Sequence, residues 1–446
     1  MNRRILALLP LLLLAMGVMA QSPMALRKAI AENPNLSVPT FSTYPPAPLA
    51  EVAKAPKGFK PFYISHFGRH GSRYDIGPKS QKRIVKLLEK ADSLKLLSEK
   101  GQQALAYAKE ILNKQTGNNE ELSALGAKQL REMGVRTATN FHEVFERGGV
   151  VNARSSYIQR CLDSRDNFTQ SLSKAYPSLT IENSSTKEDM RIMRPGLYTD
   201  EMSANHHNYA VKGEWRGWLK EWADRQDCAY AIKRISPDAT QFLKKMGVHP
   251  FHFMKDLFRV LQFALNFEVG SEEFISSIFS DEDRYKMYIY TTYPIVSYYG
   301  GVGHPIMDVR EACMRPLIED IISHADKAVS EESPKTVAHL RFSHDTYFSP
   351  LIVAIGYDGC EPKIMRDVEL STTSVNYSMM VPMAASLQLV FYRNKRGEVL
   401  VRSLLNERDI TLPIASATAP FYRWEDMRTY LQQRMDMFDK KAGLKK

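Results

Sequence analysis

The stretch FYISHFGRHGSRYD, Phe62 to Asp75, joins a short apolar run to a dense group of positive charge. Residues 62–67 are typical of a buried strand. The run ends in two glycines set among two arginines and two histidines. Within the stretch 62–75, no acidic residue precedes Asp75. Burying a charge costs on the order of several kcal/mol unless an opposite charge compensates it. The sequence therefore predicts an anionic ligand at the end of this strand.

The segments around this stretch alternate between helix and strand patterns. Apolar residues recur at helical spacing in 79–97, 124–145 and 157–176, and a β-rich piece covers 149–156. Strand patterns return at 336–342, and 386–394 with 398–405 predict a hairpin turning at Lys395–Gly397. This order predicts an α/β fold with a mostly parallel sheet flanked by helices and a largely helical inserted cap domain.

Changes of composition divide the chain into five parts. Seven prolines predict an extended arm with little regular structure near the N-terminus, and aromatic and Met-rich helical patterns mark the insertion. The predicted divisions are a signal peptide (1–20), an N-terminal arm (21–58), the first part of the α/β core (59–184), a helical insertion or cap (185–335) and the second part of the core (336–446).

The first twenty residues have the pattern of a secretory signal peptide. Arg3 and Arg4 precede an apolar stretch, and Val18-Met19-Ala20 is a small-residue cleavage site. We expect an exported protein, periplasmic or secreted, with no membrane insertion after signal removal; a membrane anchor is the alternative. The formal net charge of +10 suits an anionic substrate or simple solubility, and the pairing of the four cysteines stays open.

Three polar clusters follow predicted strands, at 69–73, 154–160 and 344–345. Ligands of open α/β sheets bind beyond the carboxyl ends of the strands, so the clusters are expected to converge. A guanidinium group can form two parallel hydrogen bonds with phosphate oxygens. It also neutralises the negative charge of those oxygens, which would otherwise repel an incoming nucleophile. Gly68 and Gly71 would let the backbone approach the ligand closely. The sequence predicts a phosphate-binding site.

The residue types predict direct attack on phosphorus by a histidine. The sequence has neither an HExxH motif nor a GxxxxGK[ST] loop, and a helix through Phe67-Gly68-Arg69 is disfavoured, so we expect no metal and no cofactor. A neutral imidazole at His70 can hold a phosphoryl group, and Asp345 can protonate the leaving alkoxide. The alternative role of Asp345 is to cap the helix that follows. A proton donor of this kind predicts a raised pKa and an optimum in mildly acidic solution.

Four motifs together resemble the histidine phosphatase superfamily in its acid phosphatase and phytase branch. RHGSR (69–73) resembles the signature, and ELSALGAKQLREMG (121–134) resembles the helix that follows it. SSYIQRCLDS (155–164) resembles the segment that supplies a third arginine, and RFSHDTYFSPLIVAIGY (341–357) resembles the late His-Asp motif. The resemblance implies the following roles: His70 as nucleophile, Asp345 as proton donor, and Arg69, Arg73, Arg160 and His344 as phosphate ligands, the third arginine being Arg160 rather than Arg154.

Within this branch the chain resembles multiple inositol-polyphosphate phosphatases. Arg160-Cys161, the PLIVAIGY helix and the segment VPMAASLQLVFYR carry the likeness. Two positions depart from that pattern: His344-Asp345-Thr346 stands where that group has His-Ala-Glu, and Asp75 stands where the family commonly has Pro. The first leaves the substrate and the position of attack open. The second predicts added negative charge near the mouth of the pocket.

The leading hypothesis is a metal-independent phosphomonoester hydrolase that acts on an inositol polyphosphate such as phytate. The alternatives are a broad acid phosphatase for sugar phosphates or nucleotides, and a non-catalytic anion-binding protein. The expected partner is an anionic small-molecule phosphate ester, with no nucleic acid, and the oligomeric state is not predicted. Lys79, Lys82 and Arg83 follow the signature and are candidates for contacts to outer phosphates, or else form a solvated helix face.

Overall fold

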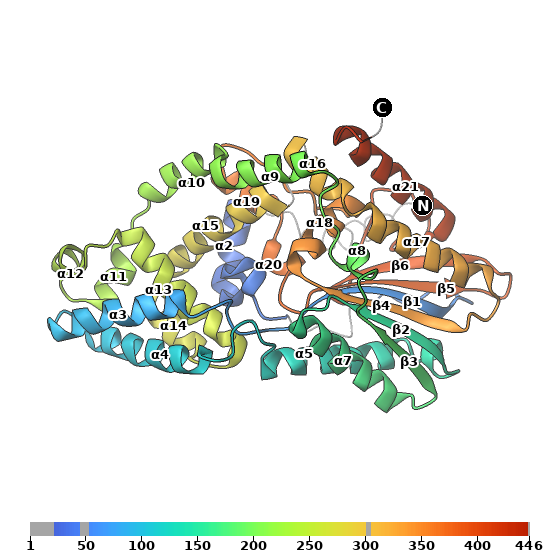
Figure 1. Cartoon of the computed structure of the whole chain (residues 1–446), viewed down its shortest axis with the longest axis horizontal. Helices are drawn as coiled ribbons and strands as arrows, with labels where there is room; N and C mark the ends of the chain where they lie inside the picture. The colour runs from blue at the N-terminus through green and yellow to red at the C-terminus, as the bar shows by residue number, and fades with distance from the viewer. Residues whose placement is uncertain (1–21, 45–52, 300–304, 445–446) are drawn as a thin grey trace, which may run out of the picture.

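The structure is a computed structural model that describes residues 22–44, 53–299 and 305–444. Two lobes lie side by side, one built on a β-sheet and the other from helices (Figure 1). The predicted signal peptide, residues 1–20, lies outside the described residues. Within the described ranges no helix has the length and apolar character needed to cross a membrane.

The sheet lobe is organised around a sheet that contains eight strands in the described part of the chain, in the order β3-β2-β4-β1-β5-β6-β7, with β8 paired to β6. Strands β3, β2, β4 and β1 are parallel, and the strands from β5 onward add an antiparallel flank. The strands are β1 (Lys60–Arg69), β2 (Gly149–Ser155), β3 (Leu179–Ser184), β4 (Thr336–Ser343), β5 (Ser386–Arg393), β6 (Val399–Leu405), β7 (Arg408–Ile410) and β8 (Phe421–Arg423).

Strand β1 is central, with β4 on one side and β5 on the other. Its residues from Tyr63 to Arg69 are buried on both faces, which explains the continuous apolar run from Phe62. The β5–β6 hairpin pairs Leu387 with Leu405 through to Arg393 with Val399, as predicted. The predicted α/β class is confirmed.

Helices cover both faces of the sheet (Figure 1). One face packs against α5 and α7 through a cluster that includes Ile64, Leu130 and Phe168. The other packs against α17, α18 and α21 through a cluster that includes Phe67 and Leu351. The helices of this lobe are α5 (Ala124–Asn140), α6 (His142–Phe145), α7 (Gln159–Ala175), α8 (Met190–Met193), α16 (Pro305–Ala312), α17 (Arg315–Ser330), α18 (Asp345–Ile355), α20 (Tyr377–Met380) and α21 (Trp424–Lys441).

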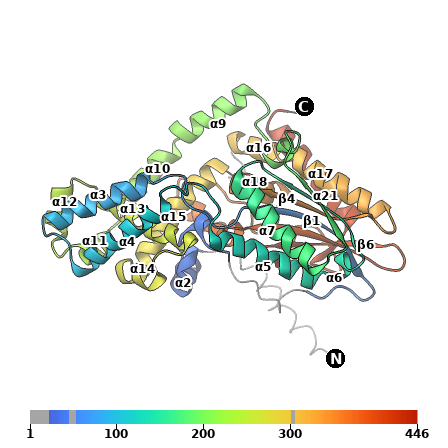
Figure 2. The ribbon, with the colours of Figure 1, turned by 60° about the horizontal axis from the view of Figure 1, so that its bottom comes forward.

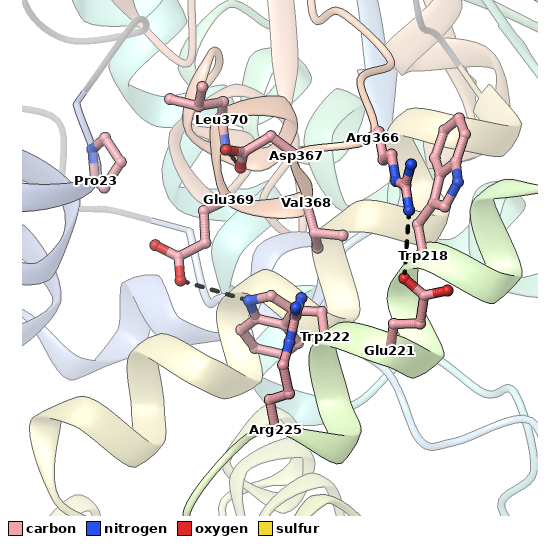
Figure 3. Close-up of a pocket in the computed structure, with 10 residues that line it drawn as sticks. All are labelled: Pro23, Trp218, Glu221, Trp222, Arg225, Arg366, Asp367, Val368, Glu369 and Leu370. Carbon is pink, nitrogen blue, oxygen red and sulfur yellow. Dashed lines mark hydrogen bonds and ion pairs between the residues drawn. The ribbon is translucent and has the colours of Figure 1, made fainter.

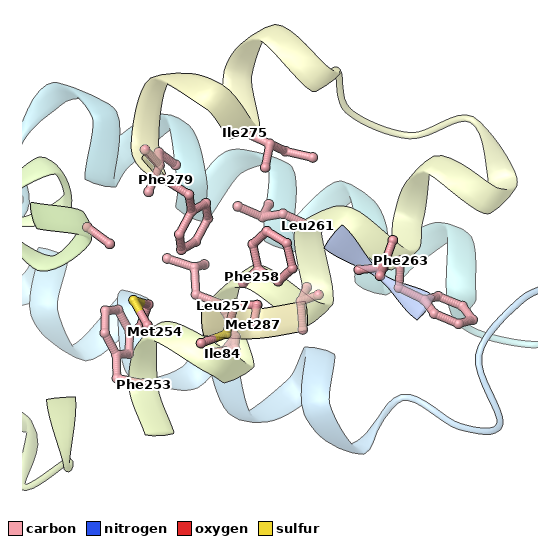
Figure 4. Close-up of a cluster of buried hydrophobic side chains, with 14 of the residues drawn as sticks. Ile84, Phe253, Met254, Leu257, Phe258, Leu261, Phe263, Ile275, Phe279 and Met287 are labelled. Carbon is pink, nitrogen blue, oxygen red and sulfur yellow. The ribbon is translucent and has the colours of Figure 1, made fainter. Parts of the chain in front are cut away.

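The helical lobe has its own apolar core, in which Ile84 of α3 meets Leu257 and Leu261 of α13 and Met287 of α15 (Figure 4). Its helices are α2 (Pro23–Glu32), α3 (Lys79–Ser93), α4 (Glu99–Gln115), α10 (Trp215–Asp224), α11 (Ala229–Ile235), α12 (Ala239–Met246), α13 (Pro250–Ala264), α14 (Glu272–Ile278), α15 (Asp281–Tyr299) and α19 (Val368–Thr373). Helix α9 (Asp200–Lys212) lies between α10 of this lobe and α16 of the sheet lobe (Figure 2).

The hydrophobic cores divide the chain differently from the boundaries predicted at 185 and 335. Helices α3 and α4 belong to the helical lobe although they precede residue 185, and α17 packs on the sheet although it precedes 335. Apolar helix faces pair with the core that complements them, whatever their place in the chain.

The predicted extended arm is also corrected. Residues 23–32 form α2, and the short 3-10 helices η1 (Pro34–Ser37) and η2 (Pro39–Phe41) follow it. Pro23, Pro34 and Pro39 each occupy the first turn of one of these helices, where proline is tolerated because that N–H has no helical partner. The prolines therefore start helices here and do not prevent them.

Candidate active site

Two histidines meet at the carboxyl edge of the sheet because their strands are neighbours. The parallel register of β1 and β4 sets Arg69 opposite Ser343, the last residue of each strand. The next residues, His70 and His344, therefore lie at the same edge, with ring centroids 5.6 Å apart. The backbone N–H of His70 donates to the Ser343 carbonyl over 3.0 Å. This is the strand-end convergence that the sequence predicted.

The loop after β1 packs backbone to backbone against helix α5. A Cβ atom added at Gly126 would stand 2.0 Å from the Ser72 carbonyl oxygen, and one at Gly71 would stand 2.6 Å from the Gly126 oxygen. The Ser72 N–H donates to Gln129 Oε1 over 2.9 Å. Both glycines and Gln129 are therefore needed to hold the loop that carries His70.

The hydrogen bonds of His70 fix its tautomer. Its Nδ1 lies 2.9 Å from the Gly71 carbonyl oxygen, which can only accept, so Nδ1 carries the hydrogen and Nε2 keeps its lone pair. The Gly71 N–H donates in turn to Ser164 Oγ over 3.1 Å. Burial, followed by the charges of Arg69 and Arg73, holds the pKa of His70 well below its usual value. The imidazole is neutral and able to act as a nucleophile.

A cluster of guanidinium groups surrounds His70. The side chains of Arg73 and Arg160 line the same cavity as His70 and His344. The buried Nε atoms of Arg69, Arg73 and Arg160 have no hydrogen-bond partner in the part of the chain that the structure describes. Burial and the neighbouring charges of Arg69 and Arg160 lower the pKa of Arg73 to about 10. Such a concentration of positive charge favours binding of an anion.

Arg69 is placed differently from the other two arginines. It is fully buried and is not among the residues that line the cavity. Its Nη1 donates to the carbonyl oxygens of Thr40 (2.6 Å) and Val381 (3.0 Å), and its Nη2 donates to Asp345 Oδ2 (3.1 Å). Its charge acts on His70 and Asp345, while a direct contact between Arg69 and phosphate stays a prediction.

Asp345 is the first residue of α18, and the N-cap position belongs to His344. The alternative role of Asp345 as the N-cap is therefore not what the fold shows. Burial would raise the pKa of this carboxyl, but Arg69 and then Arg73 outweigh that effect, and the pKa lies below its usual value. The raised pKa predicted for a proton donor is not a property of the protein alone. A phosphate dianion would offset the arginines and raise it.

His344 is held by side chains of the segment after β2. Its Nε2 lies 3.2 Å from Ser156 Oγ, its Nδ1 accepts from Arg160 Nη2 over 3.4 Å, and Cys161 Sγ lies 3.6 Å from Nε2. Burial, followed by the charge of Arg160, lowers the pKa of His344 to about 3. A neutral His344 with Nε2–H results. Ser156 lies within the arginine segment SSYIQRCLDS, but the sequence assigns it no role.

Arg154, the other arginine of this segment, belongs to a separate network. Its guanidinium donates to Asp320 Oδ1 over 2.9 Å and lies 3.0 Å from His324 Nε2. Arg160, in contrast, donates to Glu120 Oε2 over 2.8 Å at the edge of the cavity. The choice of Arg160 over Arg154 agrees with this geometry.

The cavity at the strand ends has a volume of about 660 Å³ and lies between the two lobes. It brings together His70, Arg73, Arg160, His344 and Asp345 of the predicted site. The predicted outer contacts do not line it: these are Lys79, Lys82 and Arg83, at the start of α3. Arg83 forms an ion pair with Asp256 of α13 instead.

The cavity is also lined by charged residues that belong to none of the motifs described above. They are Glu120, Arg194, Lys255 and Arg259. Arg194 donates to Tyr157 Oη over 2.9 Å at the exposed rim. The i, i+4 spacing of Lys255 and Arg259 in an apolar helix was the only signal that could have found them.

A second pocket, of about 440 Å³, lies where α2, α10 and α19 meet (Figure 3). Its polar groups bond to each other: Trp222 Nε1 donates to Glu369 Oε1 over 3.4 Å, and Arg366 pairs with Glu221 at 3.9 Å. Asp367 accepts from the N–H of Leu370 at the start of α19. The polar groups of this pocket are therefore engaged with one another at the interface between the helices.

The four cysteines, Cys161, Cys228, Cys313 and Cys360, are all buried and unpaired. In the described ranges no group of three or more His, Cys, Asp or Glu side chains is arranged to hold a metal ion.

Solved structures with this fold include phosphatases of inositol polyphosphates. The multiple inositol polyphosphate phosphatase of Bifidobacterium longum, in a complex with inositol hexasulfate, aligns with a TM-score of 0.70 at 18% identity over 89% of this chain and 97% of that one. The phytase of D. castellii aligns with a TM-score of 0.64 at 16% identity over 92% and 87%. No curated protein matches the sequence.

A family model adds evidence from the sequence itself. The model of the histidine phosphatase superfamily (branch 2) matches residues 68–406, which include both histidines of the cavity and Arg73, Arg160 and Asp345. The match covers most of the chain. The protein belongs to the histidine phosphatase superfamily, branch 2.

Proposed function

We propose that the protein is a metal-independent phosphomonoester hydrolase that forms a phosphohistidine at His70, with an inositol polyphosphate as its favoured substrate. One observation carries the proposal. A buried imidazole whose Nδ1–H is committed to Gly71, leaving Nε2 unprotonated, lies in a cavity with buried guanidinium groups. This arrangement presents a nucleophile to a bound phosphate.

The reaction proceeds in two transfers. His70 Nε2 attacks phosphorus, the P–O bond to the alcohol breaks, and Asp345 gives its proton to the leaving alkoxide. Water then attacks the phosphohistidine and gives a proton to the Asp345 carboxylate. The N–P bond breaks, which regenerates His70 and releases phosphate. Asp345 takes part as an acid only when the bound phosphate offsets the charges of Arg69 and Arg73.

The remaining groups stabilise charge. Arg73 and Arg160 bind the phosphate oxygens, and their rigid forks favour the charge distribution of the transferred phosphoryl group. Ser156 orients the Nε2–H group of His344, and the uncharged ring of His344 lies beside the bound phosphate. Arg69 holds Asp345 in place over 3.1 Å.

Two observations support a polyphosphorylated substrate. The B. longum phosphatase was crystallised with inositol hexasulfate, and this chain shares its fold. Arg194, Lys255 and Arg259 add cations to the cavity beyond those at His70. Broad hydrolysis of sugar phosphates or nucleotides is the alternative, which a comparison of phosphate release from phytate and from a sugar monophosphate separates.

The test of the activity is hydrolysis of p-nitrophenyl phosphate by the purified protein in excess chelator. We expect turnover, its loss in His70→Ala, and no change in His142→Ala, which removes an exposed histidine outside the cavity. Rapid quenching should trap a base-stable, acid-labile phosphoryl adduct on His70. Binding of phosphate without turnover would instead support an anion-binding protein. Export stays a prediction, which N-terminal sequencing of the mature protein checks.

A further inference from the structure

Helix α13 contributes one wall of the cavity from the helical lobe. Lys255, Arg259 and Phe263 are spaced i, i+4 and i+8, so they share a face, and all three line the cavity. Other α13 side chains, such as Leu257 and Leu261, are buried in the apolar core (Figure 4). The core therefore fixes the position of the cations on this wall.

Arg259 is held by Asp75, the residue that stands where the family commonly has Pro. Its Nη2 donates to both carboxylate oxygens of Asp75, over 3.0 Å and 3.1 Å. The Asp75 side chain is only 5% exposed, whereas that of Arg259 is 32% exposed. The negative charge predicted at the pocket mouth is thus compensated by Arg259, and the guanidinium keeps N–H groups that can reach a ligand.

The Asp75 side of this pair is rigid. Its backbone N–H donates to Gln115 Oε1 over 2.8 Å, and its carbonyl accepts from Gln115 Nε2 over 3.0 Å. Its carboxylate also accepts from the Ile76 N–H and from Gln81. A carboxylate fixed in this way restricts the rotamers of Arg259 and reduces the entropy that a ligand contact would cost.

The guanidinium carbons of Arg259 and Arg73 both lie close to one aromatic ring, 5.6 Å and 5.7 Å from the Phe263 ring centroid. Two cations that share one neighbouring side chain can each bind a different phosphate of the same small ligand. Lys255, one turn before Arg259, pairs with Asp256 at 3.1 Å and remains a quarter exposed.

We propose that Arg259, positioned by Asp75 and assisted by Lys255, binds a second phosphate of a substrate whose reacting phosphate lies at His70. The inference rests on the proposed function and deepens it. The substrate class is then a phosphate ester with at least two phosphates on one compact scaffold. Asp75 is a positioning residue, since it acts only through Arg259.

The test is competitive inhibition of p-nitrophenyl phosphate hydrolysis by inositol hexasulfate and by inorganic phosphate. Arg259→Ala should raise the Ki of the hexasulfate about tenfold, equivalent to about 1.4 kcal/mol. It should raise the Ki of phosphate less than about twofold. Lys255→Ala should give a smaller rise with the same selectivity, about threefold. Lys244→Ala removes an exposed cation of the same lobe and should change neither Ki.

The role of Asp75 is tested by a double-mutant cycle. Asp75→Asn should raise the Ki of the hexasulfate about threefold in the wild-type background and have no effect in the Arg259→Ala background. A purely structural effect of Asp75 would persist in both backgrounds and would overturn the positioning role. Arg259→Lys keeps the charge without the fork and provides a second variant if Arg259→Ala does not fold.

Two results overturn the second phosphate site: an unchanged Ki for the hexasulfate in Arg259→Ala, or an equal rise for the hexasulfate and for phosphate. Failure of the proposed function is a separate outcome. If the wild-type protein hydrolyses no p-nitrophenyl phosphate, titration calorimetry of inositol hexasulfate into the wild type and Arg259→Ala still decides whether Arg259 binds the ligand.

Discussion

Replacing Gly126 by alanine places a methyl group in the contact between α5 and the loop that carries His70. The new Cβ would stand 2.0 Å from the Ser72 carbonyl oxygen and 2.8 Å from the Ser72 nitrogen. The loop or the helix must then shift by more than about 1 Å to restore ordinary contact. Overpacking of this kind costs about 1–3 kcal/mol of folding stability. A 1 Å displacement of a catalytic group costs about 100-fold in rate.

The assay is kcat for p-nitrophenyl phosphate together with the free energy of unfolding in urea. Gly134→Ala is the matched control, because its Cβ would stand 2.6 Å from the Phe168 carbonyl oxygen, on the same helix but about 12 Å further along it. We expect both variants to lose about 1–3 kcal/mol of stability. Only Gly126→Ala should also lose about 100-fold in kcat.

A second control separates the contact from the loss of glycine. Gly217 of α10 has nothing within 4 Å of an added Cβ, so Gly217→Ala should stabilise the protein by about 0.5–1 kcal/mol and leave kcat unchanged. A folded Gly126→Ala variant with full kcat would refute the reasoning. So would equal losses of kcat in Gly126→Ala and Gly134→Ala.

Three further predictions concern protons. Asp345→Asn should lower kcat about 10²- to 10⁴-fold for an alkyl phosphate and far less for p-nitrophenyl phosphate, whose leaving group needs little protonation; equal losses would remove the role of proton donor. Because the pKa of His70 lies well below 6.5, kcat/KM for p-nitrophenyl phosphate, which needs little protonation by Asp345, should stay level from pH 7.5 to 5.5 after correction for substrate ionisation; with an ordinary histidine it would fall about tenfold. His66, buried between Phe168 and Phe342, has its pKa lowered to about 3 by burial and then by Arg341, so below pH 6.5 it binds a proton only in the unfolded chain. Stability is therefore lost as the pH falls, and in urea denaturation His66→Leu should reduce the loss between pH 7 and pH 5 by about 2 kcal/mol; an unchanged loss would contradict this.

Residues in local motifs could be placed from the sequence because strand ends determine their position. His70 and His344 each follow a buried strand, and the parallel register of those strands alone brings the two rings together. The hairpin of β5 and β6 and the helix α5 followed equally from local patterns. These features depend on short-range periodicity, which a single sequence contains.

Features that depend on packing between distant segments could not be placed. Lys255 and Arg259 reach the cavity because α13 packs on α3, and no local pattern encodes that contact. Arg83 is predicted from the sequence as a substrate contact, but Asp256 of α13 forms an ion pair with it. The position of Arg69, beside Asp345 but outside the cavity lining, also depends on its hydrogen bonds to the carbonyl groups of Thr40 and Val381. These two residues lie far apart in the chain.

The adjacency of β1 and β4 has a consequence for biosynthesis. The two strands are hydrogen-bonded neighbours although most of the chain separates them. Joining them closes a loop whose entropy costs roughly 5 kcal/mol, and contacts of such high order form slowly. A nascent polypeptide that ends at α15 (Asp281–Tyr299) contains His70, the proposed nucleophile, but neither His344 nor Asp345. Under the proposed mechanism, the site is therefore complete only after translation has passed Asp345 and β4 has paired with β1.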